Sequence, residues 1–412
     1  MRIVSFFGMF VMLGIAWLFS RNKKAINYKA VAAGTLLQII LAALIMKVPA
    51  GQRFFMFLND VIVKLLSFTN EGSKFVFGGL MNTSSVGFIF AVQVLPTIIF
   101  FSSLMGVLYY LGIMQKIVMA FAWVMTRFMN SSGAESLVAS ANIFVGQTEA
   151  PLAIRPYMAS LTESELFVVM TAGMGTLAGG VMGSYTGMLL PYVPGIGGHL
   201  LAACIMSSVG SLVIAKIIVP ETDDPVTRGK LDMKLELPDK NVIDAAANGA
   251  TTGMQMALNV GACLLAFMAL LAMLNFIVGH LGALAGHPSL SLEKIFGWVF
   301  TPIAWLTGVP LKEAPQIGTW IGQKTVLNEF VAYFSMADFL KANPAAISQR
   351  SLIIAAHALA GFSNFLSIAI QIGGLGALAP ERRHEIARLG LYAVLAGSLA
   401  CFMSAAITGF LI

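Results

Sequence analysis

Long apolar stretches with almost no charge constrain this sequence more than any other feature. Eight of them are compatible with membrane-spanning helices: residues 3–20, 29–46, 87–114, 165–190, 199–219, 245–279, 351–379 and 387–411. A helix needs about 20 predominantly apolar residues to cross the hydrocarbon core of a bilayer. Charged residues make up only 11% of the chain, against about 25% in soluble domains. We therefore predict an all-α polytopic membrane protein with eight transmembrane helices.

Basic residues beside the apolar runs set the expected orientation. The first run lacks a small-residue cleavage site and is followed by the basic segment 21–29, so we expect a retained span rather than a signal peptide. Basic residues also precede the last run, at 382–388. Since Lys and Arg accumulate in cytoplasmic loops, we expect both termini to lie outside, in a bacterial inner membrane. The net charge of +6 is then explained by topology, and we expect no nucleic-acid partner.

Three further stretches are apolar but do not form clean spans. Near residues 53–68, apolar side chains mark one helical face and Arg53, Asn59, Asp60 and Lys64 mark the other, which indicates an amphipathic helix lying in the membrane interface. The segments 135–157 and 291–340 are interrupted by polar residues and proline. Irregular backbone at membrane depth is tolerated only when it is buried in protein or lines a wet cavity. We therefore interpret these two segments as re-entrant hairpins.

A hydrophilic segment divides the chain into two halves. Residues 221–244 carry seven acidic and four basic residues and are expected to form a cytoplasmic linker. We expect scaffold helices in 1–115 and a first transport repeat in 116–220, made of the hairpin 135–157, a broken helix at 165–190 and a span at 199–219. A long scaffold helix is expected at 245–280. The second transport repeat is expected at 281–412, with the hairpin 291–340, a broken helix at 351–379 and a last span at 387–411.

The two hairpins share a pattern that points to a binding site. Each places a glutamate after a polar neighbour in apolar surroundings: VGQTEA at 145–150 and TVLNEF at 325–330. Each is followed by a glycine-rich span and then a further span, and the two units would enter the membrane from opposite sides. Paired interrupted helices in an inverted repeat indicate a site near the bilayer midplane of a secondary transporter.

Glu149 and Glu329 are the strongest functional candidates. A charged group at the centre of a membrane helix costs about 2.5–3.5 kcal/mol on insertion scales, and such residues are usually functional. The alternative is that each glutamate pins its hairpin to a neighbouring helix. Asn142, Thr176 and Ser367 are small polar residues in interrupted segments, and so is Asn364. Each is either a ligand contact or a hydrogen-bonding group between helices.

Three motifs resemble those of the concentrative nucleoside transporters. They are NIFVGQTEAP at 142–151, NEFVAY at 328–333, and GFSNFLS at 361–367 with GGLG at 373–376. The likeness covers nearly the whole chain in order. It implies a homotrimer in which a scaffold part holds the trimer together. A transport part with two opposed hairpins would carry substrate and sodium across the membrane like an elevator.

The resemblance also implies roles for individual residues. Gln147, Thr148 and Glu149 would contact the nucleobase, and Val181 would flank it. The ribose would be bound by Glu329, Asn364 and Ser367, and Phe362 would pack against the nucleoside. A sodium ion would be held by the side chains of Asn142 and Thr176 and the carbonyls of Val145 and Leu177. Relatives often carry serine and isoleucine at the positions of Thr176 and Leu177, but threonine keeps the hydroxyl and a backbone carbonyl does not depend on its side chain.

The implied function is sodium-driven import of nucleosides, with uridine-like pyrimidines as the favoured substrates and no cofactor. Proton coupling, with Glu149 as the proton carrier, is the alternative. A membrane-embedded enzyme is a remote alternative, because the sequence offers no nucleophile–base pair or metal cluster at membrane depth. A channel would not require inverted hairpins, and the sequence lacks the G-x-x-x-x-G-K-[ST] motif of an ATP-driven pump.

Overall fold

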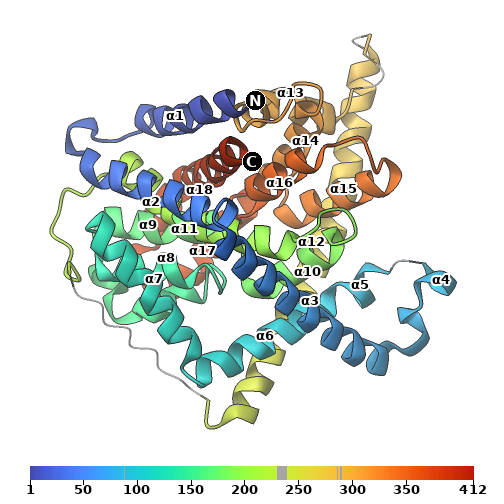
Figure 1. Ribbon diagram of the computed structural model, residues 1–412, viewed down its shortest axis with the longest axis horizontal. Coiled ribbons are helices and arrows are strands. Elements are labelled where there is room, and N and C mark those ends of the chain that lie inside the picture. The colour runs from blue at the N-terminus through green and yellow to red at the C-terminus, as the bar shows by residue number, and fades with distance from the viewer. Residues whose placement is uncertain (88, 230–238, 285, 288–289) are drawn as a thin grey trace.

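A computed structural model describes residues 1–412 except 88, 230–238, 285, 288 and 289. The described residues form helices and no β-strand, as the apolar periodicity predicts (Figure 1). The helices are α1 (Arg2–Leu18), α2 (Tyr28–Met46), α3 (Pro49–Phe77), α4 (Thr83–Val86), α5 (Phe90–Gln93), α6 (Leu95–Tyr110), α7 (Ile113–Met129), α8 (Gly133–Ala141), α9 (Glu163–Gly175), α10 (Gly179–Leu189), α11 (Ile196–Ile218), α12 (Val242–Leu284), α13 (Leu292–Leu306), α14 (Ala314–Val326), α15 (Glu329–Ala342), α16 (Gln349–Leu359), α17 (Phe365–Leu378) and α18 (Arg383–Leu411). Short 3₁₀ segments lie at Lys23–Ala25, Gly78–Met81, Ala150–Ser160 and Pro380–Arg382.

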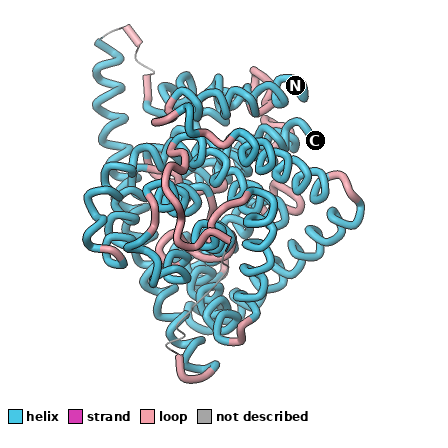
Figure 2. The backbone as a smooth tube through the Cα atoms, turned by 90° about the vertical axis from the view of Figure 1, so that its left-hand side faces the viewer, coloured by secondary structure: helices cyan, strands magenta, loops and turns pink. Residues whose placement is uncertain are grey.

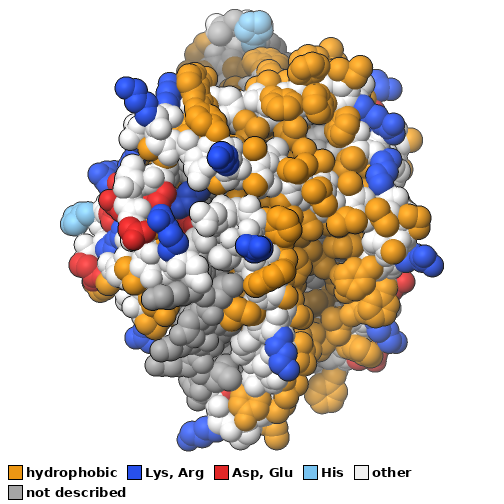
Figure 3. Space-filling model, turned by 60° about the vertical axis from the view of Figure 1, so that its left-hand side comes forward, with side chains coloured by type: hydrophobic (Ala, Val, Ile, Leu, Met, Phe, Trp, Pro, Cys, Tyr) orange, Lys and Arg blue, Asp and Glu red, His pale blue; other side chains and the backbone are white. Residues whose placement is uncertain are grey.

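Six helical segments among the described residues are long and apolar enough to cross a membrane. They are Tyr28–Met46, Phe90–Tyr110, Glu163–Leu189, Ile196–Ile218, Val242–Leu284 and Pro380–Leu411. Arg2–Leu18 and Phe365–Leu378 are apolar but shorter. All eight fall within or over the eight predicted spans. Figure 3 shows hydrophobic side chains over much of one face of the molecule, with Lys and Arg side chains scattered around its edges. Such a face is suited to contact with lipid.

Two of the predicted spans are interrupted in the middle. Residues 176–178 separate α9 from α10, and Thr176 there has an extended backbone (φ −130°, ψ 166°). Residues 360–364 separate α16 from α17, and Asn364 forms the N-cap of α17. Each interruption leaves backbone N–H and C=O groups without helical partners. Both interruptions therefore place polar backbone deep inside the helix bundle.

Two helix–turn–helix units correspond to the predicted hairpins, with changed boundaries. The first consists of α8, a turn at 142–149 and the 3₁₀ segment Ala150–Ser160. The predicted hairpin 291–340 contains three helices rather than two, because Gly308 (φ +99°) and Pro310 end α13 and separate it from α14. The turn of the second unit is therefore the short connection at 327–328 between α14 and α15. Whether these units enter and leave the membrane on one side stays a prediction.

The helix predicted near 53–68 is part of the longer α3. Not all of the residues expected on its polar face meet water. Asn59 is buried and accepts a hydrogen bond from the Gly197 N–H, 3.1 Å away. Phe54, Phe57 and Phe68 are exposed. The polar face of α3 therefore contacts the start of α11. The exposed phenylalanines are suited to contact with lipid.

Helix α7 was not predicted from the sequence. Charged and polar residues such as Lys116, Thr126 and Arg127 interrupt its apolar run. Its buried side chains nevertheless recur at helical spacing: Met114, Val118, Ala122, Met125 and Met129. This stripe packs against α8 and α2.

Helix α11 has packing partners in both halves of the chain. Helix α11 packs beside α9, α18 and α2, and α1 packs along α18 (Figure 1). The two ends of the chain lie close together in both views (Figures 1 and 2). Helix α12 packs mainly against α6, and most of its other side chains are exposed. Helices α1 and α2 of the expected scaffold 1–115 pack against α18 and α11 of the two repeats. The division of the chain into scaffold and transport parts stays a prediction. Of the predicted linker 221–244, residues 230–238 lie outside the described part of the chain.

Candidate functional site

One cavity of about 410 Å³ lies where both turns and both helix interruptions converge. Pockets of this size hold drug-sized molecules. All eight residues predicted to contact substrate line it: Gln147, Thr148, Glu149, Val181, Glu329, Phe362, Asn364 and Ser367. Other lining residues include Tyr185 of α10 and Thr252, Gln255 and Asn259 of α12. The cavity therefore lies between the repeat helices and α12.

Glu329 is held in place by groups from both repeats. It begins α15, where Asn328 caps the helix by accepting a 2.9 Å hydrogen bond from the Val331 N–H. The Tyr185 hydroxyl donates to Glu329 Oε1 at 2.9 Å, and Asn364 Nδ2 donates to Oε2 at 3.1 Å. Only 6% of Glu329 is exposed. This carboxylate is a fixed acceptor at the cavity wall, suited to hydroxyl donors of a ligand.

An aromatic group supports the Tyr185 hydroxyl. The Tyr185 ring stacks on Tyr333, with centroids 4.6 Å apart, and meets Phe330 edge-on at 5.1 Å. Tyr333 in turn donates a hydrogen bond to the Ala356 carbonyl at 3.0 Å. Because both tyrosines are buried, the packing leaves the hydroxyl of Tyr185 little freedom to turn away from Glu329.

Gln147 occupies the other side of the cavity. Its Nε2 donates to Ser367 Oγ at 3.2 Å, and its Oε1 accepts a 3.1 Å hydrogen bond from Gln371 Nε2. Gln371 also donates to the Met170 carbonyl at 2.9 Å. An oriented amide can pair with the donors and acceptors of a planar heterocycle. Ser367 links the two sides, because its N–H donates to Asn364 Oδ1 at 2.9 Å.

Glu149 is less firmly held than Glu329. Its Oε2 is buried without a hydrogen-bond partner among the described residues, and the side chain folds back over Gly146. Glu149 also borders a second cavity of about 240 Å³ between α6, α12 and the first turn. It therefore lies between two adjoining cavities.

The four residues predicted to hold sodium lie at the first turn and the first helix interruption. The Gly179 N–H donates to the Phe144 carbonyl at 2.9 Å, which ties the turn to the interruption. Asn142 is 1% exposed, and neither Oδ1 nor Nδ2 has a partner among the described residues. A buried unsatisfied polar group costs about 1–3 kcal/mol. The Thr176 hydroxyl donates to the Ala172 carbonyl at 2.9 Å, which leaves its oxygen lone pairs available as a hard ligand. This set of oxygens suits a small cation.

Sequence reasoning missed two residues that orient the site. Gln371 is a polar residue inside the apolar segment 365–378, so its composition could have revealed it. Tyr185 gave no such signal, because its contact with Glu329 joins residues 144 positions apart. The polar residues Thr252, Gln255 and Asn259 of α12 are spaced along one helical face, and this stripe was also overlooked.

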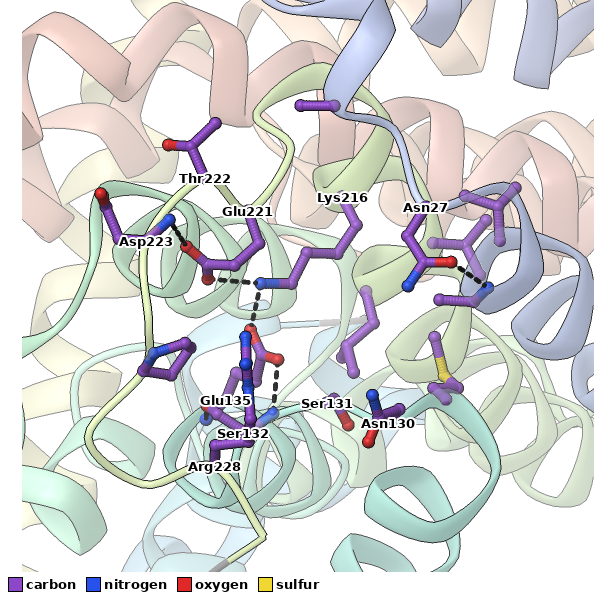
Figure 4. Close-up of a pocket in the computed structure, with 17 residues that line it drawn as sticks. Asn27, Asn130, Ser131, Ser132, Glu135, Lys216, Glu221, Thr222, Asp223 and Arg228 are labelled. Atoms are coloured by element: carbon purple, nitrogen blue, oxygen red, sulfur yellow. Dashed lines mark hydrogen bonds and ion pairs between the residues drawn. The ribbon is translucent and has the colours of Figure 1, made fainter.

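A separate polar cavity of about 300 Å³ lies at one end of the repeats (Figure 4). Lys216 of α11 is at its centre, 2.8 Å from Glu135 Oε2 and 3.2 Å from Glu221 Oε2. Lys216 also donates to Ser164 Oγ at 3.0 Å. Glu135 forms a capping box with Ser132 at the start of α8. None of the predicted site residues lies here, and the cluster fastens α8, α9 and the start of the linker to α11.

Comparison with known protein families identifies the chain. A family model described as "Na+ dependent nucleoside transporter C-terminus" matches residues 199–409, and its N-terminal counterpart matches residues 7–80. The chain belongs to the concentrative, Na+-dependent nucleoside transporter family. A further model, described as "Nucleoside recognition", matches residues 91–192. These are transporters, not enzymes, in agreement with the sequence analysis.

Relatives in this transporter family cover the chain almost completely. The nucleoside permease NupC of Helicobacter pylori is 42% identical over 411 residues, which span 98% of this chain and 96% of the relative. Solute carrier family 28 member 3 of Homo sapiens is 39% identical over 100% of this chain and 60% of its own length. An uncharacterized transporter of Haemophilus influenzae is 46% identical, over 99% and 97% of the two chains.

Solved structures of a nucleoside transporter share the fold. CNTnw in an inward-facing substrate-bound state superposes with a TM-score of 0.93 at 46% identity, covering 100% of this chain and 98% of CNTnw. A CNTnw variant in an outward-facing state gives 0.94 at 45% identity, covering 100% and 97%. The described helices therefore have the arrangement of this transporter family.

Proposed function

We propose that this transporter is a sodium-coupled symporter that imports nucleosides, with uridine-like pyrimidines as preferred substrates. One observation carries the proposal: all eight residues expected to contact a nucleoside line a single cavity. The Glu329 carboxylate would accept hydrogen bonds from the ribose hydroxyls, next to Asn364 and Ser367. Gln147, Thr148 and Glu149 would face the base, with Val181 and Phe362 packed against it.

Sodium would bind beside this cavity. Asn142 and Thr176 would supply side-chain oxygens, and Val145 and Leu177 would supply carbonyls. The unsatisfied Asn142 amide supports this assignment, since a cation would satisfy its buried oxygen. The unpartnered Oε2 of Glu149 favours a second candidate, a proton-coupled symporter in which this carboxylate carries the proton.

We further propose that the protein works as a homotrimer in a bacterial inner membrane by an elevator movement of the two repeats. Both termini would lie outside. Ion pairs support this topology: Arg21, which follows α1, and Arg388, near the start of α18, both pair with Glu163 at the start of α9. The segments expected in the cytoplasm therefore meet at one end of the molecule.

Uptake of radiolabelled uridine into proteoliposomes tests the function. We expect accumulation under an inward sodium gradient and little without one, and unlabelled pyrimidine nucleosides should compete. Accumulation driven only by a proton gradient would establish the second candidate. Failure to transport any nucleoside under either gradient would refute the proposal.

A further inference from the structure

Lys324 is a fully buried cation close to the substrate cavity. It lies in the last turn of α14 and is 0% exposed. Its Nζ donates to the Ala358 carbonyl at 3.0 Å and lies 5.7 Å from the centroid of the Phe402 ring. Among the described residues it has no carboxylate within ion-pair distance. Burying an ammonium group without a directly paired anion costs several kcal/mol, so its retention calls for an explanation.

The position of Lys324 relates it to Glu329. Lys324 precedes the turn at 327–328 by three residues, and Glu329 follows that turn directly. Ala358 lies in the last turn of α16, just before the interruption that carries Asn364, a partner of Glu329. Lys324 itself is not among the residues that line the cavity. The ammonium group therefore lies behind the wall of the cavity and not in contact with its contents.

Only a few charged side chains lie near the cavity, so their charges can be summed. Glu149 and Glu329 line it, and Lys324 lies behind it. The other buried carboxylates of the described chain, Glu135, Glu165 and Glu313, lie at the starts of α8, α9 and α14. In each case the turn or interruption lies at the other end of the helix, and none of the three lines the cavity. When both carboxylates are ionised, they and the one ammonium group leave the surroundings of the cavity with one negative charge.

We propose that Lys324 is the fixed countercharge of the substrate cavity: with one sodium ion and a neutral nucleoside bound, the loaded site carries no net charge. This inference rests on the proposed function and adds a role for a residue that touches neither ligand. The loaded protein would then cross the membrane without moving charge. The empty protein would return with one negative charge, and only that step would respond to the membrane potential.

A neutral substitution at Lys324 changes this balance. Lys324→Gln can still donate a hydrogen bond but leaves the loaded site with one negative charge, whereas Lys324→Arg keeps the charge. A potential of about 100 mV biases one charge that crosses the whole field about 50-fold between the two sides. Exchange of nucleoside between two loaded states isolates this step, because the empty protein never has to return.

The experiment is exchange in proteoliposomes with saturating sodium and uridine on both sides, labelled uridine outside and a potassium diffusion potential set with valinomycin. We expect exchange by the unaltered protein to be independent of the potential, while its net uptake accelerates when the interior is negative. Between zero potential and about 100 mV, the exchange rate of Lys324→Gln should change up to about threefold. The exchange rate of Lys324→Arg should stay constant.

Four results have distinct meanings. Potential-independent exchange by Lys324→Gln, even at a reduced rate, would show that Lys324 only caps α16 and would overturn the inference. Potential-dependent exchange by the unaltered protein would overturn it without any variant, which covers the case in which the variants do not fold. Potential-independent exchange and accelerated net uptake by the unaltered protein, together with potential-dependent exchange by Lys324→Gln, would support it. Absence of any nucleoside exchange by the unaltered protein would refute the proposed function, and this inference with it.

Discussion

The hydroxyl of Tyr185 donates a 2.9 Å hydrogen bond to Glu329 Oε1, joining α10 of the first repeat to α15 of the second. Hydrogen bonds to charged groups contribute about 1.5–3 kcal/mol. We predict that Tyr185→Phe weakens nucleoside binding about tenfold or more, because the carboxylate loses one of the two groups that orient it. Isothermal titration with uridine measures this. Tyr333→Phe removes a buried tyrosine hydroxyl from the same stack but not from Glu329, and it should leave affinity within about twofold.

Glu329→Gln should abolish measurable uptake. The amide keeps the shape of the side chain but replaces a charged acceptor of two hydrogen bonds by one neutral acceptor and one donor. That donor would face the Tyr185 hydroxyl or the Asn364 amide. Initial rates of uridine uptake test the prediction, with binding measured on the same purified protein. Unchanged affinity would remove Glu329 from the site.

Gln371→Leu should lower nucleoside affinity about fivefold. The substitution removes the donor that holds Gln147 Oε1 and leaves the Gln147 amide free to rotate. A neutral hydrogen bond contributes about 1 kcal/mol, which sets the expected size. Gln38→Leu is the matched control: Gln38 is also fully buried and donates to a backbone carbonyl, Met206 O, outside the cavity. Equal loss of affinity in both variants would argue against a positioning role.

Asn142→Ala should remove the sodium dependence of uptake or abolish uptake. The side-chain oxygen at this position has no hydrogen-bond partner in the described protein. Its removal should therefore mainly weaken the binding of a cation. Sodium activation curves of uridine uptake measure the effect. Asn343→Ala, at an exposed helix end, should leave the curve unchanged. An identical curve for Asn142→Ala would contradict the assigned sodium site.

Lys216→Met should destabilise the protein by about 3–5 kcal/mol, because it leaves a buried carboxylate without its cation. Glu135 is only 1% exposed and would lose the Lys216 ammonium 2.8 Å away. Thermal unfolding in detergent, followed by size-exclusion chromatography, is a suitable measurement. Lys74→Met breaks the exposed pair with Glu71 and should have little effect. If Lys216→Met and Lys74→Met melt at the same temperature, the cluster does not stabilise the fold.

The sequence predicted the parts of the fold that follow from local composition. Apolar runs located the long helices, and the glycine and polar residues at 176–180 and 361–364 indicated two interrupted spans. The same signals failed where local pattern is weak. Lys116 and Arg127 interrupt the apolar run of helix α7, and α13 is separated from α14 by a short segment that contains Gly308 and Pro310. These boundaries depend on packing partners that the sequence does not specify.

The site was predictable through its motifs and not through its supporting contacts. Gln147, Glu149 and Glu329 are unusual at membrane depth, and they do line one cavity. Tyr185 and Lys324 are fully buried, but their importance arises from contacts across long sequence separations. Such contacts become visible only when the helices are placed together.

The Phe362 N–H donates to the Thr176 carbonyl at 3.3 Å, so the two interrupted spans are joined backbone to backbone. Thr176 belongs to the proposed sodium site and Phe362 to the proposed nucleoside site. A ligand that orders one of these interruptions therefore also restrains the other. By thermodynamic reciprocity, sodium must increase nucleoside affinity by the same factor by which nucleoside increases sodium affinity. The hydrogen bond between Phe362 and Thr176 is a direct structural connection through which the two proposed sites can influence each other.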